Sequence, residues 1–132
     1  MTHEARGTFE VKATREPPFD DSDGVVLGRT RFDKRFQGDL DATSRVEMLS
    51  AGTPTPGSAV YVAIEKVSGR LGGRAGSFAM AHLGVMRRGA PTLAISVVPD
   101  SGTGELAGLE GSFDIEIKDG QHFYTMRYAL PE

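Results

Sequence analysis

The stretch "FDIEIKDGQHFYTMRYAL" (residues 113–130) alternates apolar and polar side chains on both sides of an Asp-Gly pair. In a β-strand, successive side chains point to opposite faces, so a period of two predicts strands that are half buried. Asp-Gly is a residue pair that the two-residue turn of a β-hairpin favours. The stretch therefore predicts an antiparallel hairpin with one face of each strand against a core.

The same alternation continues toward the N-terminus. "TFEVKAT" (8–14) and "RTRFDKRFQG" (29–38) each place apolar side chains on one face and charged side chains on the other. "AVYVAIEKV" (59–67) and "TLAISVV" (92–98) are apolar on both faces and rich in β-branched residues. Such strands fit a sheet covered on both sides, or a barrel wall around an occupied interior.

Two further segments are less regular. "ATSRVEML" (42–49) is predicted as a strand, and so is "RAGSFAMAHLGVM" (74–86). The second segment could also form a short helix, although Gly76 and Gly84 disfavour one.

Turn signals separate all these segments, and glycine is abundant, at 17 of 132 residues. Turn-rich β proteins use glycine freely, whereas long helices do not. The sequence predicts about eight strands with short connections and no helix. We predict an all-β fold: a single domain over residues 1–132, built as one antiparallel eight-stranded up-and-down β-barrel.

Composition narrows the possible functions. The chain has no cysteine, which excludes disulfides, thiolate catalysis and cysteine-ligated metals. A net charge of −3 argues against non-specific binding of nucleic acid. The basic strip at residues 29–36 contains two phenylalanines and could stack RNA bases, but it also fits a strand with an outward charged face. We find neither a signal peptide nor an apolar run long enough to span a membrane, and expect a cytoplasmic protein.

Four segments resemble one protein family: "KRFQGDL", "YVAIEKVSGRLGGRAGSFAMAHLG", "VVPDSGTGELAGLEG" and "DGQHFYTMRYALP". They are similar to an uncharacterised bacterial family with a domain of unknown function and an allene oxide cyclase-like fold. The resemblance covers about residues 29 to 131 and implies an eight-stranded antiparallel barrel. It implies no established activity. No motif here matches the polar pocket in which plant allene oxide cyclases cyclise a fatty-acid epoxide, so no catalytic residue is carried over.

The glycines of "VVPDSGTGELAGLEG" (97–111) invite comparison with a dinucleotide-binding loop. That loop needs G-x-G-x-x-G opening a helix, and here the spacing is one residue longer and a strand follows. We interpret the segment as a glycine-bent connection between two strands. Glu105 within it could hold turn N–H groups, pair with Arg74, or contact a ligand. "DSGTG" also echoes the aspartic-protease turn, but one copy would need a symmetric dimer to form a dyad.

Side chains of three strands give the candidate site. Glu65 shares a face with Tyr61, His82 shares one with Phe78 and Met80, and His122 shares one with two tyrosines. If these faces point inward, a carboxylate, two imidazoles and three phenols line an apolar cavity. The candidate catalytic residues are Glu65, His82 and His122, and the candidate ligand-binding residues are Tyr61, Glu65, Phe78, Met80, His82, Glu105, His122, Tyr124 and Tyr128. Alternatively, these polar groups satisfy one another in a closed core or at the barrel mouth.

The sequence predicts no metal site and no cofactor, because the three histidines lack zinc-ligand spacing. Three functions stay open. The first is a module that binds a small hydrophobic or amphipathic molecule in the barrel interior or mouth. The second is an isomerase or cyclase that uses glutamate, histidine and tyrosine as acid–base groups, and the third is a non-catalytic interaction protein. The possible partners are a small hydrophobic ligand and further copies of the chain, as a homo-oligomer.

Overall fold

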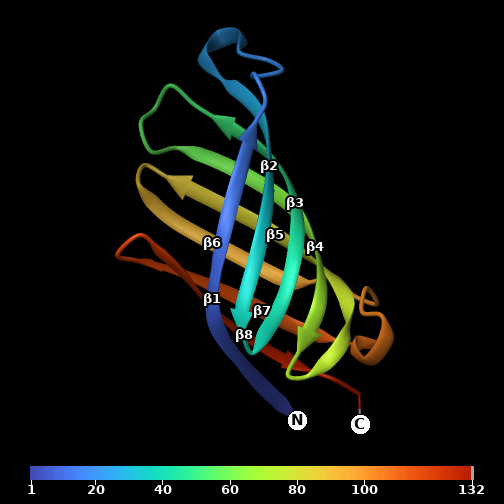
Figure 1. Ribbon diagram of the computed structural model, residues 1–132. Helices are drawn as coiled ribbons and strands as arrows, with labels where there is room; N and C mark the ends of the chain where they lie inside the picture. Colours follow the sequence, from blue (N-terminus) through green and yellow to red (C-terminus); the bar gives the residue numbers. More distant parts are fainter. Residues whose placement is uncertain (132) are drawn as a thin grey trace.

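The computed structural model describes residues 1–131, which form one closed sheet of antiparallel strands (Figure 1). Each strand pairs with the next along the chain, and the last pairs with the first. The strands are β1 (Thr2–Arg15), β2 (Val26–Gly38), β3 (Leu40–Gly52), β4 (Ala59–Leu71), β5 (Arg74–Arg87), β6 (Ala90–Val97), β7 (Glu110–Lys118) and β8 (Gln121–Ala129). Single 3₁₀ turns lie at η1 (Ser22–Gly24) and η2 (Gly104–Leu106). The prediction of an eight-stranded up-and-down barrel is confirmed.

The hairpin predicted at residues 113–130 joins β7 to β8. Ile117 faces His122 and Lys118 faces Gln121 across the two strands. The two turn residues, Asp119 and Gly120, have φ angles of 52° and 77°. Both angles are positive, as the tight turn that matches the twist of a hairpin requires.

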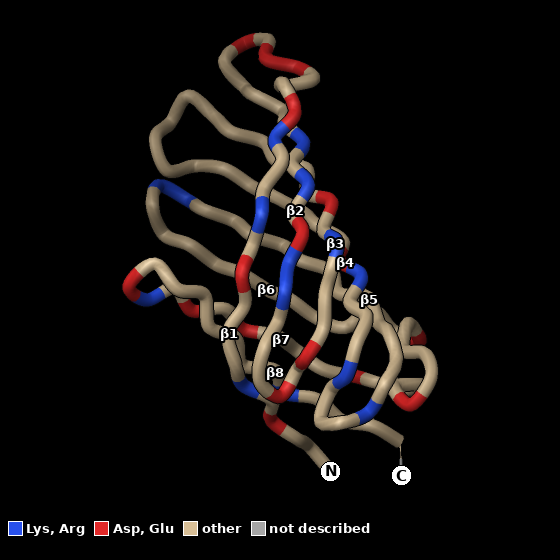
Figure 2. The backbone as a smooth tube through the Cα atoms, in the orientation of Figure 1, with Lys and Arg blue, Asp and Glu red and all other residues tan. Residues whose placement is uncertain are grey.

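Charged residues recur along β1 and β2, where the backbone is coloured blue and red in Figure 2, and most of them are exposed. Across these strands Glu10 faces Arg35 and Lys12 faces Asp33, so opposite charges stand side by side. Arg35 also pairs with Asp41 of β3 at 2.6 Å. These contacts fit the interpretation of the basic strip as an outward strand face.

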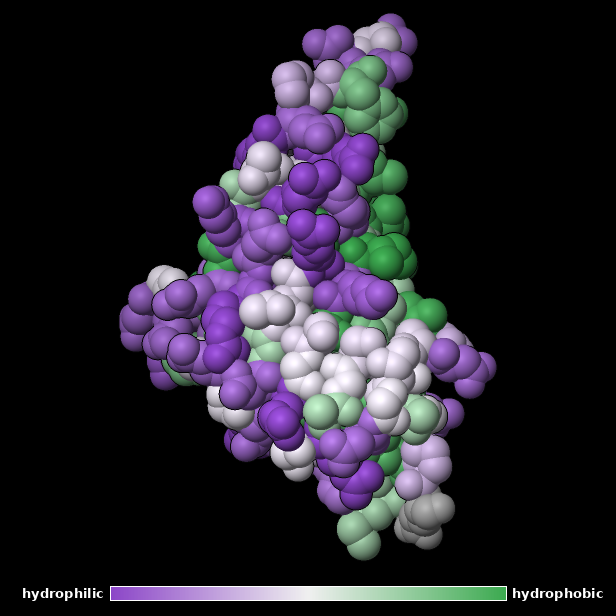
Figure 3. Space-filling model, turned by 45° about the vertical axis from the view of Figure 1, so that its right-hand side comes forward, coloured by the Kyte–Doolittle hydropathy of each residue, from purple (hydrophilic) through white to green (hydrophobic). Residues whose placement is uncertain are grey.

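The outer face of β4 and β5 is different, because it carries apolar side chains in place of charges. Val62, Ile64 and Leu83 are all exposed, Ile64 by 58%. Figure 3 shows hydrophobic side chains gathered along one side of the upper part of the molecule. The inner face of segment 59–67 lines the barrel interior. Its outer face is also apolar, but no described residue covers it.

The segment 74–86 is strand β5, so the alternative prediction of a short helix is wrong. Its pairing with β4 runs over its whole length, from Arg74 opposite Leu71 to Met86 opposite Ala59. Gly84 has a packing role here: a Cβ at this position would lie 2.1 Å from the ring of Tyr61, which β4 places directly across from it. A helix would lose all of these strand pairings. Pairing with β4 therefore outweighs the local conformational preference of the segment.

The connection from β6 to β7 closes one end of the barrel, the end at which both termini lie (Figure 1). It bends at Gly104, where φ is 59°, and sends Leu106 and Leu109 into the interior, where both are 1% exposed. The prediction of a glycine-bent connection between strands is confirmed. No helix of the described residues is long and apolar enough to cross a membrane.

The ladder between β6 and β7 is the shortest in the barrel. A single residue pair, Ser96 with Ser112, joins these strands, whereas nine pairs join β7 to β8. The first part of β6 and the last part of β7 therefore make no ladder contact with each other.

Candidate functional site in the open half of the barrel

The barrel interior has a filled half and an open half. The filled half lies toward the termini and is packed with aromatic rings. Phe36 meets Phe113 and Tyr124 edge-on, with centroid separations of 5.9 and 5.7 Å. Phe113 and Tyr124 stack at 5.4 Å. This packing leaves free space only toward the opposite end of the barrel.

The tyrosine in the filled half is held by the backbone. The hydroxyl of Tyr124 accepts a hydrogen bond from the Leu40 N–H at 2.9 Å and donates to the Gln37 carbonyl, also at 2.9 Å. Burial, the largest cause, raises the pKa of Tyr124, with the hydrogen bond from Leu40 opposing that shift. This phenol is therefore a neutral structural group.

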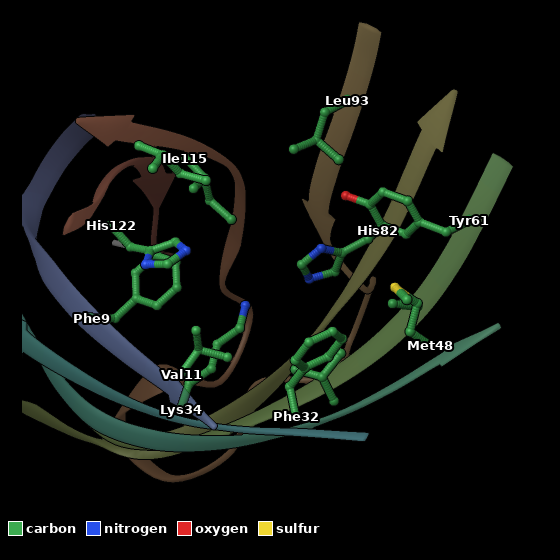
Figure 4. Close-up of a pocket in the computed structure, with 13 residues that line it drawn as sticks. Phe9, Val11, Phe32, Lys34, Met48, Tyr61, His82, Leu93, Ile115 and His122 are labelled. Carbon is green, nitrogen blue, oxygen red and sulfur yellow. The ribbon is translucent and has the colours of Figure 1, made fainter. Parts of the chain in front are cut away.

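The open half contains a cavity of about 330 Å³. All eight strands contribute to its walls, which are mostly apolar or aromatic. The lining residues are Phe9, Val11, Phe32, Lys34, Val46, Met48, Tyr61, Ala63, His82, Leu93, Ile115, Ile117 and His122. Figure 4 shows Phe9 and His122 on one side of the cavity and Tyr61, His82 and Met48 on the other. This size and lining are typical of small-molecule sites.

A cluster of polar side chains lies beneath this cavity, around Glu65. The glutamate is fully buried, and its Oε1 contacts the Nε2 of His82 at 2.7 Å and the Nζ of Lys34 at 3.4 Å. Its Oε2 accepts a hydrogen bond from the hydroxyl of Ser44 at 2.6 Å. Lys34 also lies over the rings of Phe9 and Phe36, at 4.9 and 5.9 Å from their centroids.

The partners of Glu65 keep it ionised in spite of its burial. Burial is the largest single cause and would raise its pKa, but the hydrogen bond from His82, the charge of Lys34 and the hydrogen bond from Ser44 together lower it. A negative carboxylate and a positive ammonium then stand in contact within the barrel. A contact of this kind is costly to build unless the remaining bonds are satisfied.

The backbone explains why these side chains meet. On the inner faces, Glu65 of β4 lies opposite Val46 of β3 and Met80 of β5. Ser44 and His82 are each two residues along from these partners, on diagonals that long side chains span. Lys34 lies opposite Ser44 in the β2–β3 ladder and so reaches the same carboxylate.

Two members of the cluster, Lys34 and Ser44, were not among the residues that the sequence predicted. Lys34 has the same parity as Phe32 and Phe36, and Ser44 has the same parity as Ala42 and Val46. Parity alone therefore places both side chains inside. A charged residue in an alternating strand is usually read as solvent-facing, and that assumption hid Lys34.

The predicted site residues separate into two groups. Tyr61, His82 and His122 line the cavity, and Glu65 lies directly beneath it. Burial also raises the pKa of the Tyr61 phenol. The others do not line this cavity: Phe78, Met80, Tyr124 and Tyr128 are in the filled half, and Glu105 is in η2.

Glu105 has a structural contact at the closed end. Its Oε1 accepts a hydrogen bond from the N–H of Ala75 at 3.1 Å, so it ties the loop to the start of β5. This matches the interpretation of Glu105 as a carboxylate that holds N–H groups near a turn. The contact with Arg74, which the sequence also offered, is not among its bonds in residues 1–131.

The acidic and histidine side chains do not gather into a metal-binding group. Within residues 1–131, no three of the residue types His, Cys, Asp and Glu lie close enough together to hold an ion. In the Glu65 cluster, lysine and serine occupy the places that further ligands would need. The chemistry available to the cluster is hydrogen bonding, charge pairing and proton transfer.

Fold and site together define a class of protein: a small closed antiparallel barrel with one filled half and one open, apolar half above a buried ion pair. The sequence profile of a family described as "protein of unknown function (DUF3224)" matches residues 5–128, so the chain belongs to this family. This confirms the resemblance to an uncharacterised family. The family description does not mention allene oxide cyclase, and that part of the resemblance stays a prediction.

A solved structure is similar over the whole chain. It is a protein of unknown function from the same family, from Shewanella oneidensis MR-1, with 47% sequence identity, 100% of both chains covered and a TM-score of 0.94. The barrel is therefore shared with a bacterial relative. No curated protein matches the chain.

Proposed function

We propose that the protein binds a small amphipathic molecule in the open half of its barrel. The observation that carries this proposal is the cavity of about 330 Å³, whose walls are apolar and whose floor presents Lys34 and His82. Apolar walls supply affinity by removing ligand surface from water, and a few polar groups fix orientation. A barrel built only for stability would fill this half with side chains as it fills the other half.

Filling the cavity tests the proposal. Val11 lines the cavity from β1 and is partly exposed, so a Val11→Trp substitution places an indole in the cavity at little expected cost to folding. The next residue, Lys12, faces away from the barrel, so Lys12→Trp adds the same side chain outside. The probe is N-phenylnaphthylamine, a neutral dye whose fluorescence increases in apolar surroundings.

We expect the wild-type protein and Lys12→Trp to bind the dye equally, and Val11→Trp to bind it at least about tenfold more weakly, a loss of about 1.4 kcal/mol. Equal binding by all three proteins would place the dye elsewhere and contradict the proposal. Native mass spectrometry of the protein from its own host then identifies the molecule it carries.

The contact between His82 and Glu65 favours a second candidate, an enzyme of the isomerase or cyclase type. At 2.7 Å, the carboxylate can hold one imidazole nitrogen while the other nitrogen accepts a proton from a substrate in the cavity. Tetralone, an apolar ketone with exchangeable protons next to its carbonyl, is a suitable probe. Deuterium incorporation by the wild type and its loss in His82→Gln would support catalysis, and no exchange above buffer would contradict it.

Two further elements belong to the proposal. We place the protein in the cytoplasm, because a chain without cysteine suits a reducing compartment, and cell fractionation tests this. We also propose self-association through the apolar outer face of β4 and β5, where a second copy would cover Ile64 and Leu83. Sedimentation of the wild type and of Ile64→Glu tests this, since a monomeric wild type would contradict it.

A further inference from the structure

The ammonium group of Lys34 has fewer partners than it can bind. Its side chain is 8% exposed and lines the cavity, yet its one hydrogen bond is the 3.4 Å contact to Glu65 Oε1. That oxygen is shared with His82. An ammonium has three donors, and the faces of Phe9 and Phe36 replace only part of its hydration. Lys34 can therefore donate a hydrogen bond to a group in the cavity.

The imidazole of His82 also presents an unused atom. Its Nε2 is engaged by Glu65, while Nδ1 has no partner in residues 1–131. No buried side-chain nitrogen or oxygen of these residues lacks a hydrogen-bond partner, so Nδ1 is not sealed off; it is accessible from the cavity that His82 lines. Lys34 and His82 line the same cavity, so a ligand in the cavity can meet the unused positions of both residues.

The charges of the cluster set what can bind there. Glu65 and Lys34 balance each other, so with a neutral imidazole the cluster has no net charge. A carboxylate entering the cavity would add a negative charge in apolar surroundings, which is unfavourable without compensation. A proton on Nδ1 of His82 restores the balance and supplies a second donor beside Lys34.

We propose that the ligand is a monocarboxylic acid with a compact apolar body, and that it binds together with one proton, which His82 takes up. This inference rests on the proposed function and specifies its ligand class. The carboxylate accepts hydrogen bonds from Lys34 Nζ and from the newly protonated Nδ1, while the Nε2–H of His82 remains on Glu65. The proton comes from water or buffer, and no covalent bond of the ligand changes.

None of the other polar groups around His82 is suited to take up this proton. Glu65 of β4 contacts it directly, and Lys34 of β2 and Ser44 of β3 contact the same carboxylate. Tyr61 of β4 lines the same cavity, and His122 of β8 lies on its other side (Figure 4). Its register partners, Ala63 and Ile95, are apolar. Glu65 is already ionised and fully bonded, and Tyr61 is a phenol whose pKa burial raises further. His82 is thus the member of the cluster that can take a proton on binding.

The test compares naphthaleneacetate with naphthaleneacetamide, which have the same apolar body and differ in charge. Calorimetric titration in two buffers with different ionisation enthalpies counts the protons taken up. For the wild type we expect uptake approaching one proton with the acetate and none with the amide. Because uptake is linked to binding, affinity for the acetate should rise as the pH falls, by at most about tenfold per pH unit.

Variants assign the proton and the charge. His82→Gln keeps an N–H for Glu65 but cannot titrate, so proton uptake should vanish and acetate affinity should fall by about tenfold to a hundredfold, with amide affinity unchanged. Lys34→Met should abolish acetate binding selectively, while the outward control Lys12→Met should behave as the wild type. If Lys34→Met does not fold, as judged by circular dichroism, the His82→Gln proton count still decides.

The outcomes separate this inference from the proposed function. Equal binding of acetate and amide without proton uptake would overturn the carboxylate inference, while confirming that the cavity binds apolar molecules. Proton uptake that persists in His82→Gln would also overturn it, because another group would be the acceptor. Binding of neither compound would overturn it as well, and the dye experiment with Val11→Trp would judge the proposed function independently.

Discussion

The two halves of the barrel interior use the same strands for opposite purposes. Phe36 and Phe32 lie on the same face of β2, four residues apart, and yet Phe36 is fully buried among three other rings while Phe32 borders the cavity. The difference comes from the ends of the barrel. The β6–β7 connection covers one end with Leu106 and Leu109, whereas no residue of the connections at the other end (16–25, 53–58, 88–89 and 119–120) lines the cavity. A barrel can therefore hold its fold with one half and offer the other half to a ligand.

The two phenylalanines of β2 test this comparison most strongly. Phe36→Ala should lower the free energy of unfolding by about 3–5 kcal/mol, because it leaves a cavity in tightly packed surroundings. Phe32→Ala should lower it by about 1 kcal/mol or less, because water already reaches that side chain. Urea unfolding followed by circular dichroism measures both values. Similar losses at both positions would mean that the halves are equally packed.

The two tyrosines of the interior give a smaller contrast. Tyr124→Phe should cost about 1–3 kcal/mol, since it leaves the Leu40 N–H and the Gln37 carbonyl without their partner in the filled half. The Tyr61 hydroxyl has no hydrogen-bond partner in residues 1–131, so Tyr61→Phe should change stability by less than about 0.5 kcal/mol. The same unfolding measurement applies, and a larger loss for Tyr61→Phe would contradict the assignment.

Glu65, which lies between the two halves, should make the free energy of unfolding depend on pH. Because the folded-state pKa of Glu65 is lowered, ionised Glu65 contributes stability above its unfolded pKa of about 4.3. That contribution is lost as the pH falls through the folded-state value. Glu65→Gln should therefore make the free energy of unfolding less dependent on pH in the acid range.

Other carboxylates keep part of this dependence, so the comparison needs an outward control. Glu116 lies on the outer face of β7, and Glu116→Gln should retain the wild-type slope. If Glu65→Gln and the wild type lost stability in parallel on acidification, the buried ion pair would not be the cause.

The sequence predicts the barrel well, because a period of two is a direct record of which side chains face inward. The hairpin at 113–130 and the inner faces of Glu65, His82 and His122 could all be read in this way. The depth of each residue along the barrel could not be read. Met80 and His82 share one face of β5, yet only His82 reaches the cavity, because depth depends on strand register and on the loop that closes one end.

The partners of Glu65 mark a second limit of prediction. Its contacts to Lys34 and Ser44 join residues that lie 31 and 21 positions away in the chain. Nothing local in the sequence records these distances; they follow from the registers of two ladders. The parity of Lys34 with Phe32 and Phe36 predicts an inward side chain, but its charge favoured an outward assignment. Only the pairing of three strands shows that Lys34 meets a buried carboxylate.

The single residue pair between β6 and β7 makes this the weakest backbone connection in the barrel. Seven of the eight strand ladders are long and continuous, but β6 and β7 are joined only by the pair Ser96 and Ser112. On the cavity side of this pair, Leu93 of β6 and Ile115 of β7 form part of the cavity wall. No ladder pair joins β6 to β7 beside the cavity, so side-chain packing, including that of Ile115 against the core, sets their spacing there. The cavity wall between these two strands therefore depends on side-chain packing rather than on backbone pairing, unlike the wall between any other two neighbouring strands.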